Sequence, residues 1–146
     1  MKLEPIQRYV RELGSARERH AHMREVFQKF RMGASNVTTD SYAVQGITIT
    51  NLSPDEFTVQ FLGKTVRFTF TYDHAALRGL VTVTTVSPDG ESTGPNWSFH
   101  FDGRGDVGDI EPRPNEGNYN LGVDTDAAQI VLGALHIALV RQIEVV

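Results

Sequence analysis

The stretch EFTVQFLGKTVRFTFTY, from Glu56 to Tyr72, decides how this chain folds. Apolar side chains alternate with Thr, Gln and Arg through residues 57–61 and again through residues 66–72, and a short segment containing Gly63 separates the two runs. A period of two places successive side chains on opposite faces of a strand, and a glycine-containing turn between two such runs is typical of a β-hairpin. We therefore predict a hairpin with one aromatic face and one polar face.

Further strand-like segments extend this hairpin into a sheet. Residues 42–52, 80–86 and 97–101 are rich in β-branched and aromatic side chains, and turn-forming residues separate them. We predict an antiparallel meander of about five strands within residues 41–101, with one face left polar because antiparallel sheets often keep one face in water. The predicted polar face carries Thr58, Gln60, Arg67, Thr69, Thr71, Thr82, Thr84, Ser98 and His100.

A long helix is predicted before the sheet and another after it. Apolar or aromatic positions recur at spacings of three and four over residues 5–32, which indicates one amphipathic helix. These positions are Ile6, Tyr9, Leu13, Ala16, His20, Met23, Phe27 and Phe30. Residues 124–143 are apolar nearly all round, and the longest apolar run, residues 127–140, is too short to span a membrane. This second helix is therefore predicted to cover the apolar sheet face.

The expected fold class is α+β, a single domain over residues 1–146 in two layers, with both helices on one face of the sheet. Along the chain we expect a basic amphipathic helix (1–33), the sheet (41–101), an acidic Gly/Pro loop (102–122) and a buried C-terminal helix (124–143). The predicted core is Phe57, Val59, Phe61, Val66, Phe68, Phe70, Val81, Val83, Trp97, Phe99, Phe101, Ile130, Leu135 and Leu139.

Charge is divided unevenly along the chain. Residues 1–33 hold eight lysines and arginines against four glutamates, a net charge of +4, which leaves −8 for the remainder because the whole chain carries −4. A basic helix is a possible nucleic-acid contact, but its glutamates are interleaved with its arginines and the chain as a whole is acidic. Both observations disfavour nucleic acid as the partner.

The acidic loop is the strongest sequence signal for a binding role. Residues 102–126 carry seven acids against two arginines, and loops longer than about 12–15 residues are usually functional or disordered. Such a segment suits a protein partner with a basic surface, since charge complementarity raises the association rate and specificity. The predicted partner-binding residues are Asp102, Arg104, Asp106, Asp109, Glu111, Arg113 and Glu116.

Catalytic and metal-binding patterns are weak. The chain has no cysteine, and its histidines lack the two-histidine helical spacing of a zinc protease, so we predict no metal, no cofactor and no catalytic residue. His100 is the best candidate for acid–base chemistry, because Asp102 lies two residues on and would share its face if the strand continued. The acidic residues of the loop do not follow the calcium-binding EF-hand pattern either.

These observations predict a small, non-enzymatic interaction protein of the inhibitor, immunity or chaperone type, acting as a monomer or homodimer. The N-terminus lacks the apolar segment of a signal peptide, which predicts a cytoplasmic location without a membrane role. Arginine outnumbers lysine eleven to three, which favours a bacterial or phage source. Two alternatives stay open: a nucleic-acid-associated protein using the basic helix, and a ligand-binding or hydrolytic enzyme using the polar sheet face around His100.

Overall fold

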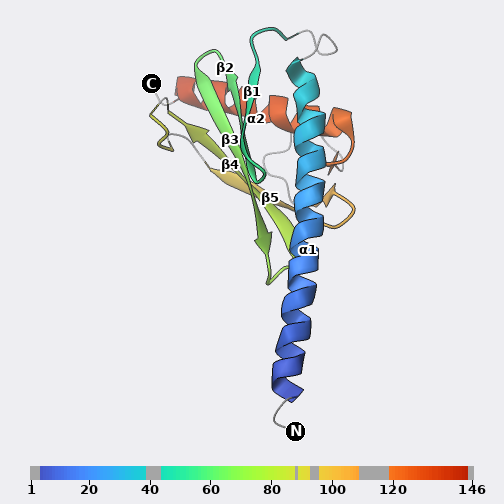
Figure 1. Cartoon of the computed structure of the whole chain (residues 1–146). Coiled ribbons are helices and arrows are strands. Elements are labelled where there is room, and N and C mark those ends of the chain that lie inside the picture. The colour runs from blue at the N-terminus through green and yellow to red at the C-terminus, as the bar shows by residue number, and fades with distance from the viewer. Residues whose placement is uncertain (1–3, 39–43, 88, 93–95, 109–118, 145–146) are drawn as a thin grey trace.

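The structure, a computed structural model, describes residues 4–38, 44–87, 89–92, 96–108 and 119–144. One long helix precedes a single continuous sheet in the sequence and another helix follows it, as Figure 1 shows. The elements are α1 (Glu4–Ala34), the 3-10 helix η1 (Ser35–Thr38), β1 (Thr48–Ser53), β2 (Glu56–Phe61), β3 (Lys64–Asp73), β4 (Arg78–Val86), β5 (Trp97–Phe101), β6 (Asp106–Val107), β7 (Tyr119–Asn120) and α2 (Asp124–Glu144). The predicted α+β class is confirmed.

The sheet is an antiparallel meander in which every strand pairs with its neighbours in sequence, in the order β1 to β7. The predicted count of about five strands is too low, because the described residues form seven. The two additional strands, β6 and β7, are two residues long and lie in the segment that we expected to be loop. Strands this short show no alternation in the sequence, so the pattern of residues does not reveal them.

The central hairpin forms as the alternation predicts. Phe57 pairs with Phe68 and Val59 pairs with Val66 across β2 and β3. The turn between these strands has positive φ at both Leu62 and Gly63, at 51° and 79°, which is the geometry of the type I′ turn that joins right-twisted strands. This register directs the aromatic residues of both strands to one face.

Both helices pack against the apolar face of the sheet. The helix α1 contacts β3 and β4, α2 contacts β2, β3 and β7, and the two helices also contact each other. Figure 1 shows that α2 crosses the upper part of the sheet, whereas α1 runs past it and projects well beyond the strands. Within the part of the chain that the structure describes, it is therefore the C-terminal half of α1 that packs on the folded body.

An aromatic cluster joins α1 to the sheet. The rings of Phe57 and Phe68 stack with centroids 4.9 Å apart, and Phe30 of α1 packs against both at 5.6 and 5.7 Å. All three side chains are completely buried. Most of the predicted core is buried, but Phe61, Trp97 and Leu139 are only partly buried, the first two because they lie at strand ends.

Candidate interaction surface

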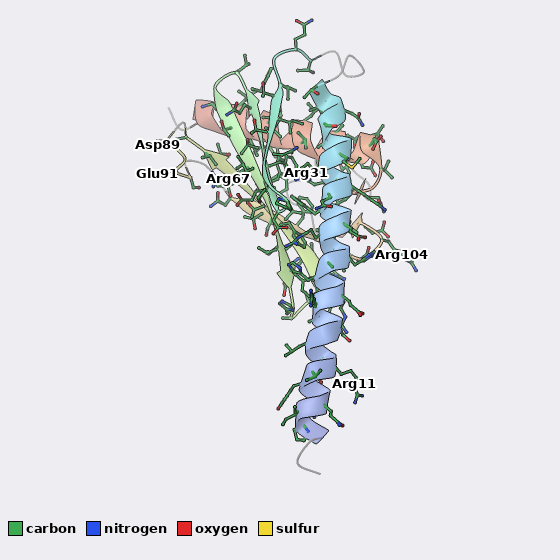
Figure 2. All side chains as sticks on the ribbon, viewed as in Figure 1. Arg11, Arg31, Arg67, Asp89, Glu91 and Arg104 are labelled. Carbon is green, nitrogen blue, oxygen red and sulfur yellow. The ribbon has the colours of Figure 1, made fainter. Side chains whose placement is uncertain are left out.

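The N-terminal half of α1 extends beyond the body of the protein. Every residue from 5 to 14 is exposed, whereas the buried positions of the helix begin at Met23. We call residues 5–19 the overhang; at 1.5 Å per residue it is about 22 Å long. Figure 2 shows Arg11 on the overhang, away from the strands, whereas Arg31 lies beside them. We predicted that this helix packs on the sheet, and among the described residues the overhang does not take part in that packing.

The overhang carries a row of large apolar side chains over which no other helix or strand packs in the described part of the chain, although the guanidinium of Arg8, on the same helix, lies 5.4 Å from the centroid of the Tyr9 ring. Ile6, Tyr9, Val10 and Leu13 are 58%, 53%, 66% and 71% exposed. Positions i, i+3, i+4 and i+7 lie on one face of an α-helix, so these four side chains form one stripe, which we call the apolar stripe. Clusters of exposed apolar residues on a soluble protein usually mark an interaction site.

Three arginines follow the stripe at seven-residue intervals and share one face of α1. Arg24 binds Asp55 in the β1–β2 turn through two hydrogen bonds, from Nε to Oδ1 at 2.8 Å and from Nη2 to Oδ2 at 3.1 Å. Arg31 Nη1 donates to the carbonyl oxygen of Ser53 at 3.0 Å. Arg17, on the overhang, has no ion pair or hydrogen-bond partner among the residues that the structure describes. The inner two arginines thus attach α1 to the sheet, and the outer one faces solvent.

The described ends of the acidic segment are fixed to the body. Asp102 Oδ1 accepts hydrogen bonds from the backbone N–H of Arg104 and of Asp106, at 2.9 and 3.0 Å. Asn120 Nδ2 donates to the carbonyl of Arg104 and to Asp106 Oδ1, at 3.0 and 2.8 Å. His22 Nε2 of α1 donates to the carbonyl of Gly103 at 2.8 Å, because a carbonyl only accepts.

Three of the predicted partner-binding residues, Asp102, Arg104 and Asp106, lie in this bonded region, and Figure 2 shows Arg104 on the same side of the body as α1. Asp102 is partly buried, and Arg104 and Asp106 are exposed. The other four predicted contacts, Asp109, Glu111, Arg113 and Glu116, lie outside the described residues. The structure brings Asp102, Arg104 and Asp106 together near Asn120. The role of all seven predicted residues in partner binding stays a prediction.

His100 has a carboxylate partner, but not the predicted one. Its Nε2 donates to Asp73 Oδ2 at 3.0 Å, since a carboxylate only accepts. The predicted partner, Asp102, instead bonds the turn that follows it, because β5 ends at Phe101 and the alternation of faces ends there. Asp73 reaches His100 because β3 and β5 both pair with β4. A histidine held by a carboxylate suits acid–base chemistry in principle, so the prediction of no catalytic residue stays a prediction.

The pKa of Asp73 lies below the usual aspartate value of 3.8, first because the backbone N–H of Ala76 donates to its carboxylate and then because His100 does. A carboxyl whose pKa is lowered in the folded state stabilises the fold above its unfolded pKa, and that stabilisation is lost as the pH falls through the folded pKa.

We therefore expect Asp73→Asn to lower the melting temperature at pH 7 and to have a smaller effect at pH 3, because below the usual aspartate value of 3.8 the stabilisation that comes from the lowered pKa diminishes. The asparagine Oδ1 still accepts the turn hydrogen bonds from Ala75 and Ala76, whereas its amide nitrogen replaces the oxygen that accepts from His100, so the change removes the charge together with that bond. Thermal unfolding of both proteins at the two pH values measures this. An equal decrease at pH 3 and pH 7 would contradict the assignment.

Other site types have little support in the described residues. No group of three or more His, Asp or Glu side chains there is arranged to hold a metal ion. Of the helices that the structure describes, neither is long and apolar enough to cross a membrane. The overhang is therefore the strongest candidate for a functional surface among the described residues.

The overhang could have been recognised from lengths alone. A 28-residue helix is about 42 Å long at 1.5 Å per residue. A strand of five to eleven residues, the range predicted from the sequence, is only about 17–37 Å long. Such a helix cannot be covered along its whole length by such a sheet, so one end had to project.

Comparisons with known proteins give no family for this chain: no family model matches it, and neither a curated protein nor a solved structure matches it.

Proposed function

We propose that this protein is a non-enzymatic protein-interaction module that docks on another protein through the overhang of α1. The exposed apolar stripe of Ile6, Tyr9, Val10 and Leu13 is the single observation that carries this proposal. Helices that bind in grooves use anchors at i, i+3, i+4 and i+7, which is the spacing of these four residues. The size and acidic composition of the chain agree with an inhibitor, immunity or chaperone role.

The test is a comparison of full-length variants in the cells that produce the protein. We expect Leu13→Glu to reduce the amount of a specific partner that copurifies with the protein at least about tenfold, because a central anchor of a helix interface is lost. Gln7→Glu is the matched control: it adds the same charge on an exposed position outside the stripe. Quantitative mass spectrometry of the retained proteins measures the effect. Equal retention by both variants would refute docking through the stripe.

The acidic segment is a proposed second contact, to a basic region of the same partner. Neutralising Asp106, Asp109 and Glu111 together, to Asn, Asn and Gln, should slow association at low salt, because long-range attraction is lost. The melting temperature should change little, since Asn at position 106 still accepts the bond from Asn120. Stopped-flow association and thermal unfolding measure the two effects. A loss of several degrees with unchanged binding would show that the segment only braces the fold.

A further inference from the structure

We propose that the partner presents an apolar groove with a carboxylate at its edge, and that this carboxylate binds Arg17 as Asp55 binds Arg24. This inference rests on the proposed function and adds the chemistry of the partner. Two features of α1 support it: the repeat of its binding face along the helix and the charge of the overhang.

The binding face of α1 repeats along the helix. From Met23 to Phe30 the apolar positions pack on the sheet, and Arg24, beside them, binds the carboxylate of Asp55. Tyr9 and Leu13 of the stripe lie two heptads before the buried residues Met23 and Phe27, and Arg17 lies one heptad before Arg24. A shift of seven residues rotates a helix by only about 20°, so Arg17 lies on the same face as Arg24. A surface that covers the stripe therefore brings its edge close to Arg17.

The charge of the overhang also favours a carboxylate. Residues 5–19 contain Arg8, Arg11, Arg17 and Arg19 against two glutamates, a net charge of +2. Arg8 Nε lies 3.8 Å from Glu12 Oε1 on the same helix, and this ion pair offsets part of the positive charge. Arg17 is exposed at the inner end of the stripe, in the position where a bidentate arginine–carboxylate pair would fix the register of the docked helix.

A second copy of this chain fits the overhang less well. The body already covers this face from about His20 onward, so another α1 could pair with the overhang only in the antiparallel direction. Arg17 would then meet the first turn of the other helix, where unpaired N–H groups carry partial positive charge. Two overhangs of charge +2 would also face each other. A different protein that carries the carboxylate avoids both repulsions.

The test begins with photo-cross-linking in the full-length chain. p-Benzoylphenylalanine is placed at position 13 on the stripe or at position 11 on the opposite face, in the cells that produce the protein, and adducts are identified by mass spectrometry. We expect one other protein to be linked from position 13 and not from position 11, at an apolar groove that contains Asp or Glu. An adduct with a second copy, or with nucleic acid, would overturn the proposal. Equal or absent adducts from both positions would overturn the proposed function as well.

The purified cross-linked protein then serves as the probe for charge. We expect Arg17→Glu to weaken its binding at least about tenfold, as loss of one partner of an interfacial charge pair does. Arg11→Glu, with the same change of charge on the far face, should alter binding less than about threefold. Replacing the groove carboxylate with lysine should restore binding of the Arg17→Glu chain. Equal effects of the two variants, with the position-13 adduct retained, would refute the carboxylate while leaving the docking surface intact.

Discussion

Phe68→Ala should lower the free energy of unfolding by about 3–5 kcal/mol, the range for emptying a large buried aromatic site. Phe68 is completely buried at the centre of the sheet, where it stacks on Phe57 and packs edge-on against Phe30. Its loss would leave a cavity between α1 and two strands. These elements hold one another in place, so neighbouring side chains can fill little of that cavity.

Chemical denaturation of the wild type and the variant measures this difference. The matched control is Leu13→Ala, which truncates a large apolar side chain that is 71% exposed. We expect that change to leave the stability within about 0.5 kcal/mol, because surface substitutions seldom exceed that. If Phe68→Ala lost less than about 1 kcal/mol, the assignment of the two sheet faces would be reversed.

Gly79→Ala is expected to destabilise the protein by about 1–3 kcal/mol or more, the range for overpacking a filled core. Gly79 lies on β4 between Tyr72 and Phe101, and the ring of Phe101 lies directly over it. A Cβ at this position would be 2.1 Å from Phe101 Cζ, much closer than atoms approach. Because Phe101 is completely buried, its ring cannot move without displacing other core residues.

Gly14→Ala is the control for this substitution, since a Cβ there would meet nothing within 4 Å on the exposed overhang. It should be neutral or stabilise the helix by up to about 1 kcal/mol, because alanine favours helix more than glycine does. Urea unfolding of the two variants separates steric clash from backbone effects. A Gly79→Ala protein as stable as the wild type would show that Phe101 does not cover this glycine.

Local patterns in the sequence were sufficient for the main elements of the fold. The alternation in residues 57–61 and 66–72 predicts both the hairpin and its buried face, because the register follows from which side chains must be covered. The same reasoning fails for β6 and β7. Val107 and Tyr119 are buried there, but they pair across a long interval of sequence and each strand has only two residues.

The candidate site was harder to predict because it depends on where the body ends. The spacing of apolar residues along α1 is continuous, so it predicts the helix without distinguishing the half that packs on the sheet from the half that does not. The partner of His100 shows the same limit. Asp102 is its neighbour in sequence, but Asp73, 27 residues away, is its neighbour across the sheet. Contacts set by strand pairing are not visible in local spacing.

Hydrogen–deuterium exchange of the free chain, at a dilution where it is monomeric, tests most directly whether the apolar stripe is available for binding. The relevant comparison is between the amides of the overhang and those from Met23 to Phe30 on the same helix. We predict fast exchange for residues 7–16, because no other described element packs on that part of α1, and exchange slower by orders of magnitude for the packed half. Equally slow exchange in both halves would show that the stripe is already covered, which would contradict a docking role for the overhang.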